Sequence, residues 1–259
     1  MEKWNNKVAL VSGASSGIGA AIAKALVRSG MKVVGTARRV ERVQELANSL
    51  SDQSGKLYAF KADWTKEEDI LRAFEWTKDN LGPVSVLINN AGVGSSGFLY
   101  NGDTNAWRTI LDTNVMSVAI ASREAIKTMN ESNIDGYIVN INSILGHEAL
   151  DVPGVNMYIG SKFAVTGMTE TLRNELAHLG SNIRVSSLSP GFVKTEIFVA
   201  SKMFTEEAYK RVKEVAPALE SEDIADAVLY MLSTPLHVQV TELIIRPIRE
   251  VGALFLDYM

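Results

Sequence analysis

A tyrosine and a lysine four residues apart could together transfer a proton. Tyr158 and Lys162 belong to the run Tyr-Ile-Gly-Ser-Lys, and on a helix this spacing places both side chains on one face. A phenol with a pKa of about 10 is a weak base at neutral pH, and a neighbouring ammonium group favours its ionised form. The pair therefore predicts general acid–base chemistry on a substrate oxygen.

The same spacing occurs a second time, at Tyr209 and Lys213. That copy lies in a charged amphipathic stretch with no strand-end serine shortly upstream. Tyr158 instead follows Ser143, which stands at the end of an apolar, strand-like run. A serine there can donate a hydrogen bond to a substrate oxygen on which charge develops. The sequence therefore favours Tyr158, Lys162 and Ser143 as catalytic residues.

A glycine-rich turn follows the first apolar run of the chain. Residues 12–19 read Ser-Gly-Ala-Ser-Ser-Gly-Ile-Gly, and a helical pattern begins within them. Glycines allow a ligand to approach the backbone, and a helix N-terminus offers free N–H groups and a positive dipole end. An ordinary turn is the alternative interpretation, since the spacing is not G-x-G-x-x-G. The residues predicted to bind a pyrophosphate are Gly13, Ser15, Ser16, Gly17, Ile18 and Gly19.

Two arginines stand where the second apolar run ends. Arg38 and Arg39 follow it directly, and no carboxylate occurs before Glu41. In dinucleotide-binding folds an acidic residue at this place binds the ribose 2′-hydroxyl, whereas a guanidinium group matches a phosphate. The arginines therefore predict NADP rather than NAD, and a solvated basic start to the next helix is the alternative.

Composition and charge exclude several classes of protein. The 259 residues are 46% apolar and 22% charged, include no cysteine and carry a net charge of −4. These values are typical of a globular protein and exclude disulfides and thiolate metal sites. His147, His178 and His237 are far apart, so no metal site is expected. The net negative charge gives no overall positive electrostatic field of the kind that non-specific nucleic-acid binding needs. The chain also has no signal-peptide-like start and no apolar run near 20 residues. We therefore expect a cytoplasmic protein without nucleic-acid partners or a membrane span.

Short apolar runs alternate with helical patterns almost to the end of the chain. This alternation predicts parallel strands with helices on both sheet faces. The expected α/β fold is a single doubly wound Rossmann-type domain, residues 1–259, with about seven parallel strands. Strands are predicted at 8–11, 31–36, 57–61, 84–89, 137–142, 183–188 and 238–245. Helices are predicted at 17–28, 40–50, 66–79, 104–130, 157–178, 206–219 and 222–232.

Taken together, these motifs resemble the short-chain dehydrogenase/reductase family over nearly the whole chain. The matching segments are residues 12–19, Asn-Asn-Ala-Gly at 89–92, Asn114, Ser143, Tyr158 with Lys162, and Pro190 to Thr195. The resemblance implies an oxidoreductase in which Tyr158 is the acid/base and Ser143 polarises the substrate oxygen. It further implies that Lys162 lowers the pKa of the tyrosine and holds the nicotinamide ribose, and that Asn114 retains a water of the proton relay.

The resemblance also implies cofactor contacts outside the glycine-rich turn. Asp63, followed by Trp64, would contact the adenine, with helix capping as the alternative role for the aspartate. The residues expected to line the cofactor or clasp its carboxamide are Asn90, Ala91, Gly92, Pro190, Gly191, Val193 and Thr195. Stabilisation of the sheet by Asn90 and an ordinary turn at Pro190 and Gly191 remain the alternatives.

Residues 34–42 and 238–247 resemble the NADP-dependent insect farnesol dehydrogenase group and its vertebrate relatives that act on steroids and other carbonyls. This implies an apolar alcohol or carbonyl substrate, with a farnesol-like terpenoid first. A broad carbonyl or steroid reductase and a non-catalytic dinucleotide-binding protein are the alternatives. Residues 146–156 and about 192–215 would cover the substrate, unless their apolar side chains pack against the core. The family resemblance also implies a homodimer or homotetramer.

Overall fold

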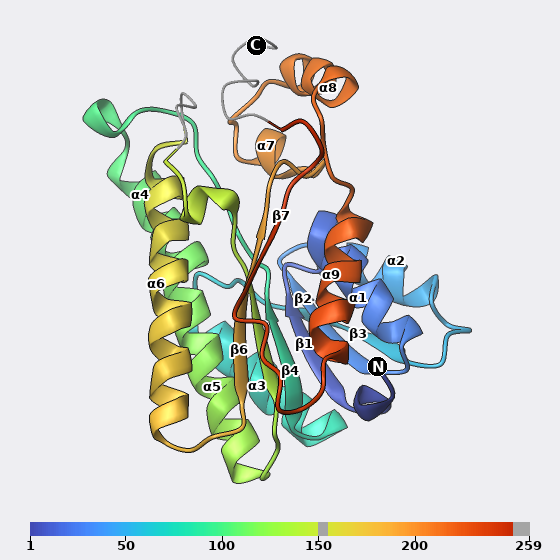
Figure 1. Ribbon diagram of the computed structural model, residues 1–259. Helices are drawn as coiled ribbons and strands as arrows, with labels where there is room; N and C mark the ends of the chain where they lie inside the picture. The colour runs from blue at the N-terminus through green and yellow to red at the C-terminus, as the bar shows by residue number, and fades with distance from the viewer. Residues whose placement is uncertain (150–154, 251–259) are drawn as a thin grey trace.

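A parallel sheet forms the centre of the computed structural model, which describes residues 1–149 and 155–250 (Figure 1). Within these residues the sheet has seven strands in the order β3-β2-β1-β4-β5-β6-β7, and every neighbouring pair is parallel. The strands are β1 (Val8–Ser12), β2 (Lys32–Ala37), β3 (Lys56–Lys61), β4 (Val84–Asn89), β5 (Tyr137–Ile141), β6 (Arg184–Pro190) and β7 (Glu242–Ile245). The order reverses direction between β1 and β4, which confirms the predicted doubly wound Rossmann-type α/β fold.

Helices cover both faces of the sheet (Figure 1). One face packs against α1 (Gly17–Arg28), α2 (Val40–Asn48) and α9 (Ser221–Ser233). The other face packs against α3 (Glu67–Leu81), α5 (Ser117–Glu131) and α6 (Asn156–His178). The remaining helices are α4 (Thr104–Leu111), α7 (Ile197–Ala200), α8 (Glu206–Val215) and short 3₁₀ turns at Glu2–Trp4, Leu99–Asn101 and Ile144–Gly146.

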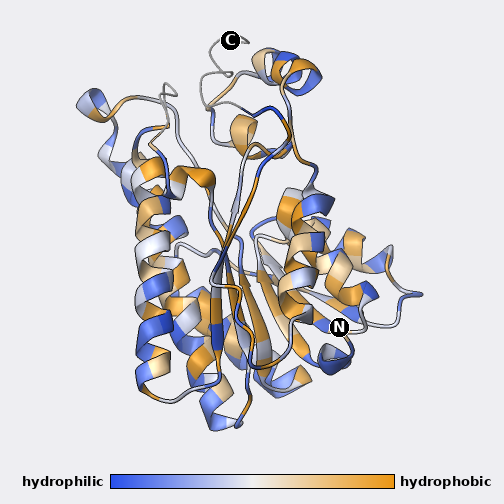
Figure 2. Cartoon of the chain, viewed as in Figure 1, coloured by the Kyte–Doolittle hydropathy of each residue, from blue (hydrophilic) through white to orange (hydrophobic). Residues whose placement is uncertain are grey.

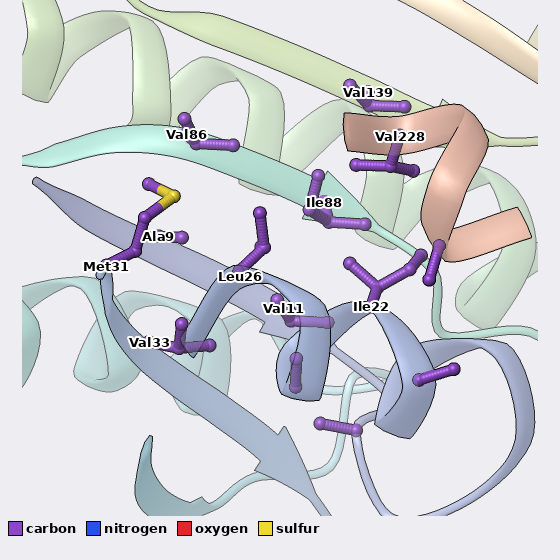
Figure 3. Packing of buried hydrophobic residues seen from close by; sticks show 14 of the residues in the cluster. Ala9, Val11, Ile22, Leu26, Met31, Val33, Val86, Ile88, Val139 and Val228 are labelled. Carbon is purple, nitrogen blue, oxygen red and sulfur yellow. The ribbon is translucent and has the colours of Figure 1, made fainter. Parts of the chain in front are cut away.

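The two layers of the core follow from the alternation of side chains along each strand. In β1, Ala9 and Val11 pack toward α1 and α9, whereas Leu10 packs toward α3 and α5. Figure 3 shows the first layer, where Ile22 of α1 and Val228 of α9 lie beside strand residues. Figure 2 shows the corresponding distribution, with apolar residues along the central strands and mixed polarity on the outer helices.

The predicted helix 206–219 is too long at its C-terminal end. Helix α8 ends at Val215, and Ala216 has an extended backbone with ψ at 138°. Residue 217 is a proline, which disfavours a helical conformation in the residue before it. The chain beyond it leaves the helix, and Leu219 forms a parallel bridge with Val193.

Two other predicted elements also differ in the structure. The helix predicted at 104–130 is interrupted by a wider π-helical turn over Asp112–Met116, and such turns are common at functional sites. The last strand begins at Glu242 instead of 238, and before it the Val238 carbonyl accepts a hydrogen bond of 3.1 Å from the Arg184 guanidinium. In the described part of the chain, no helix is both long and apolar enough to cross a membrane.

Candidate active site

A cavity of about 510 Å³ lies at the carboxyl ends of the strands, where ligands bind in doubly wound sheets. The predicted site residues that line it are Gly13, Ser15, Ser16, Gly17, Ile18, Gly19, Arg38, Arg39, Asp63, Trp64, Asn90, Ala91, Gly92, Ser143, Tyr158, Lys162, Pro190, Gly191, Val193 and Thr195. Of the predicted residues, all of which the structure describes, Asn114 alone lies outside this lining. The fold thus brings residues from six strand ends, those of β1 to β6, around one space.

Three of the predicted catalytic residues meet at one end of the cavity. Tyr158 and Lys162 lie one turn apart on α6, and the lysine Nζ is 5.6 Å from the centre of the tyrosine ring. Ser143 has an extended backbone and precedes the 3₁₀ turn after β5. Its Oγ accepts the N–H of Leu145 at 3.1 Å, and its side chain acts to lower the pKa of the Tyr158 phenol. The arrangement places a serine hydroxyl, a phenol and a buried amine in the wall of one cavity.

Burial changes the protonation of both titratable groups. Burial raises the pKa of Tyr158 to about 12, and the hydrogen bond from Ser143 opposes this increase only in part. Burial also lowers the pKa of Lys162 to about 8, while its Nζ donates to the Ile141 carbonyl at 2.9 Å. Burial is thus the largest influence on the phenol pKa, and the lowering by Lys162 that the family resemblance implies stays a prediction. At neutral pH the phenol is protonated and can act as an acid.

Asn114 lies in the π-helical turn and is almost completely buried. Its Oδ1 accepts the Val93 N–H at 2.9 Å, and its Nδ2 donates to the Val93 carbonyl at 2.9 Å and to Ser161 Oγ at 3.0 Å. Ser161 Oγ in turn donates to the Tyr158 carbonyl at 2.7 Å. The side chain of Asn114 therefore connects the loop after β4 to the first turns of α6.

The backbone of the glycine-rich turn has a conformation that lets a ligand approach it closely. Gly13 and Gly17 have φ values of 70° and 53°, a region in which other residues are strained. A Cβ on Gly13 would lie 3.0 Å from both Ala91 Cα and Asn90 Nδ2. Helix α1 begins beside the cavity without a side-chain cap and without an acidic residue in its first turn. Its free N–H groups and dipole suit a pyrophosphate, so these residues fit a dinucleotide.

The loops after β1 and β4 are joined by Ser12 and Asn90. Ser12 Oγ accepts the N–H groups of Asn90 and Ala91, each at 2.9 Å, and the Asn90 amide donates to the Ser12 carbonyl at 2.8 Å. These bonds support the structural interpretation of Asn90. The residue also lines the cavity, so the same contacts fix one of its walls.

Asp63 has a local loop contact as well as a place in the cavity wall. Its Oδ1 accepts the N–H and hydroxyl of Thr65 at 3.1 and 2.9 Å. The indole of Trp64 is buried in the core and donates to Thr36 Oγ1 at 2.5 Å. Because α3 begins at Glu67 with Lys66 as its N-cap and without a side-chain cap, Asp63 orders the loop before this helix and does not cap it.

Two carboxylates that sequence reasoning missed border the cavity. Glu196 lies 3.2 Å from Arg39 and 3.0 Å from Arg42. Glu250 accepts the Phe192 N–H at 2.6 Å, and its Oε2 is buried without a hydrogen-bond partner among the described residues. Burial raises the pKa of Glu250. Both carboxylates contact residues more than 50 positions away, so no local pattern in the sequence could have indicated them.

The expected substrate cover has two parts. Residues of α7 and its flanks line the cavity, namely Phe192, Ile197, Phe198, Ala200, Met203 and Phe204. Behind them, Tyr209 and Val212 of α8 are buried against this layer. Both interpretations therefore apply: the front of 192–215 faces the cavity and its back forms a small core. Of the other expected wall, residues 146–156, Val155 lines the cavity, as do Ile144 and Leu145 just before this segment; residues 150–154 lie outside the described residues.

The histidines, all of them within the described residues, do not lie together in a cluster that could bind a metal ion. His147 Nε2 is 3.0 Å from Ser189 Oγ and 3.4 Å from a carboxylate oxygen of Glu242. Across residues 1–149 and 155–250, no group of three histidines or carboxylates is arranged to hold a metal ion.

Comparison with known proteins gives close relatives along the whole chain. The family model for short chain dehydrogenases matches residues 7–205. The farnesol dehydrogenase of Aedes aegypti is 48% identical over 252 residues, which is 96% of this chain and 99% of that protein. Dehydrogenase/reductase SDR family member 11 of Gallus gallus is 44% identical over 255 residues, covering 97% and 100% of the two chains.

Solved structures share the fold over nearly the whole chain. A serine dehydrogenase complexed with NADP⁺ superposes with a TM-score of 0.86 at 28% identity, over 95% of this chain and 97% of that one. A short chain dehydrogenase/reductase from Burkholderia phymatum in complex with NAD has a TM-score of 0.82 at 27% identity, over 94% and 90%. With the sheet order and the Ser143–Tyr158–Lys162 geometry in place, the chain belongs to the short-chain dehydrogenase/reductase family of oxidoreductases.

Proposed function

We propose that this chain is an NADP(H)-dependent oxidoreductase acting on an apolar alcohol or carbonyl compound, with Tyr158 as the acid/base. The observation that carries the proposal is the meeting of Ser143, Tyr158 and Lys162 in the wall of one cavity, with the Lys162 Nζ 5.6 Å from the centre of the Tyr158 ring. These groups lie in the same cavity as the glycine-rich turn. A bound nicotinamide cofactor supplies or accepts the hydride.

The protonation states favour Tyr158 as a proton donor in carbonyl reduction. With a pKa raised to about 12, the phenol holds its proton until an alkoxide, which is more basic than a phenolate, develops beside it. Ser143 donates a second hydrogen bond to the same oxygen, which stabilises the developing charge. The Lys162 ammonium, which lies over the ring, stabilises the phenolate that remains. In the reverse direction the same groups remove the proton of an alcohol.

The preference for NADP rests on the basic end of β2. Arg38 and Arg39 both line the cavity, and residues 36–40 include no carboxylate that could bind a ribose 2′-hydroxyl. The test compares kcat/KM for NADPH and NADH in the wild type and in Arg38→Ala. We expect the wild type to prefer NADPH and the variant to lose about tenfold or more with NADPH only. A wild type that prefers NADH would contradict the proposal.

The apolar cover favours a hydrophobic substrate. Phe192, Phe198 and Phe204 face the cavity, and the relative from Aedes aegypti is a farnesol dehydrogenase. We propose a farnesol-like terpenoid first and a steroid or other carbonyl second, bound beneath residues 192–215 of one catalytic domain spanning 1–259. Oxidation of NADPH with a panel of terpenoid, steroid and simple carbonyls tests this, and preference for small polar carbonyls would contradict it.

We also propose a homodimer or homotetramer. Met116, the last residue of the π-helical turn before α5, and Phe163, on α6, are 51% and 43% exposed, so both are accessible to a second copy of the chain. Light scattering of the wild type and of Phe163→Glu tests this proposal. A wild-type monomer would contradict it.

A further inference from the structure

A carboxylate of the substrate cover holds two arginines at the edge of the cofactor site. Glu196 is the residue before α7. Its Oε2 lies 3.2 Å from Arg39 Nη2 and 3.0 Å from Arg42 Nη1, and its Oε1 lies 3.1 Å from Arg42 Nη1. Partial burial acts to raise the pKa of Glu196, but hydrogen bonds from the two arginines hold it below its usual range. The group is therefore an anion at neutral pH.

The same arginine contacts the phosphate-binding turn. Arg39 Nη2 donates to Ser16 Oγ at 3.2 Å, so this one nitrogen is shared between the turn and Glu196. A 2′-phosphate bound at the end of β2 requires the same guanidinium donors. Two anions at a single guanidinium repel each other, and the phosphate, with the larger charge, has the stronger interaction.

Glu196 is also the first residue of the segment 196–201, most of which lines the cavity. Ile197 and Phe198, the next two residues, line it. At the far end of the segment, Ser201 Oγ accepts the Gly94 N–H at 2.8 Å, so the cover is attached to the arginines at one end and to the loop after β4 at the other. A change at the Glu196 end therefore reaches residues that face the substrate.

We propose that Glu196 is a specificity-determining residue that competes with the cofactor 2′-phosphate for Arg39, which lines the cavity. Binding of NADPH displaces Glu196 from Arg39 and loosens α7 at that end, whereas NADH, which lacks the phosphate, leaves the ion pairs in place. Glu196 thus weakens NADPH binding and couples the identity of the cofactor to the cover. This inference rests on the proposed use of NADP(H).

The first test measures dissociation constants of NADPH and NADH for the wild type and for Glu196→Gln by isothermal titration calorimetry. Removing the competing charge should tighten NADPH binding about threefold to fivefold, the size of an exposed ion pair, and change NADH binding less than twofold. Glu67→Gln is the matched control. Glu67 forms a similar exposed ion pair with Arg123, with 2.8 Å between Oε1 and Nη2, and neither residue lines the cavity. The control should change neither constant.

The second test measures hydrogen exchange of residues 197–200 with saturating NADPH or NADH. In the wild type, NADPH should give faster exchange than NADH, and in Glu196→Gln the two cofactors should give the same fast exchange. Equal changes in both dissociation constants, or no difference between cofactors in wild-type exchange, would overturn the inference. A wild type without preference for NADPH would overturn the proposed cofactor as well, whereas a clear preference that Glu196→Gln leaves unchanged would overturn the role of Glu196 alone.

Discussion

Tyr158 and Lys162 lie on a helix packed against the centre of the sheet, whereas Phe198 and Phe204 lie on a segment outside it (Figure 1). Behind the catalytic end, buried amides join β4, β5 and α6. Asn89 donates to Asn140 Oδ1 at 2.8 Å, and the Asn140 amide donates to Thr169 Oγ1 at 2.8 Å. The catalytic helix is thus fixed to two central strands by hydrogen bonds that water does not reach.

The cover has a different construction. Phe198 is 5.1 Å from Phe192, 5.6 Å from Phe204 and 5.7 Å from Tyr209, measured between ring centres. Beyond this small cluster, the contacts of the cover with its surroundings are the hydrogen bond from Gly94 to Ser201 and several others, together with exposed ion pairs. Exposed pairs contribute about 0–1 kcal/mol each. The reacting groups are therefore held by the sheet through buried hydrogen bonds, whereas the substrate-facing wall can change at little cost to the fold.

The largest effect should come from removing the proton donor. Tyr158→Phe deletes the hydroxyl but keeps the ring, so we expect kcat to fall about 10²- to 10⁴-fold with the fold retained. The measurement is NADPH oxidation with a carbonyl substrate, alongside circular dichroism. Tyr209→Phe is the matched control, because it makes the same change in the cover and should leave kcat nearly unchanged. Loss of activity in the control and not in Tyr158→Phe would contradict the assignment.

Burial of Lys162 predicts a dependence of stability on pH. Its pKa of about 8 in the folded chain is below the ordinary 10.5, so between these values the unfolded chain binds more protons. The free energy of unfolding therefore rises with pH in this window, by up to about 3 kcal/mol for this group. Tyr158, raised from 10.0 to about 12, has the opposite effect above pH 10.

Urea denaturation of the wild type and of Lys162→Met isolates this contribution. We expect the stability of the wild type relative to the variant to increase as the pH rises from about 8 toward 10. A difference that stays constant over that range would show that the amine is solvated, and would weaken the contrast between a buried catalytic end and a loosely attached cover.

A smaller effect, confined to substrate binding, is expected in the cover. Phe198→Ala removes an aromatic wall of the cavity, so kcat/KM for an apolar substrate should fall about tenfold, mainly through KM. The urea midpoint should change little, because the cluster is separate from the main core. Steady-state kinetics with a terpenoid and a small carbonyl test this, and an equal loss with both substrates would show that Phe198 acts on the catalytic end.

The same contrast separates what the sequence could predict from what it could not. Strand and helix periodicity is local, so the sheet, α1 and α6 could be predicted, and with them the positions of Ser143, Tyr158 and Lys162. The end of α8 could also have been predicted, because the proline at residue 217 is a local signal, but the helix was predicted to continue to residue 219. Glu196 and Glu250 reach the cavity only through tertiary packing. The raised pKa of Tyr158 likewise depends on burial, which spacing does not reveal.

The smallest effect should distinguish the two kinds of attachment. Lys194 in the cover pairs with Glu220 at 2.6 Å, with side chains 34% and 57% exposed. Lys194→Met should lower the free energy of unfolding by less than about 1 kcal/mol, and high salt should remove the difference because it screens exposed charges. Asn140→Ala, which leaves buried partners unsatisfied, should cost about 1–3 kcal/mol at any salt concentration. If Lys194→Met lowered the free energy of unfolding as much as Asn140→Ala does, and equally at low and high salt, the cover would be part of the same rigid framework as Tyr158. Substrate selection would then not be separable from stability.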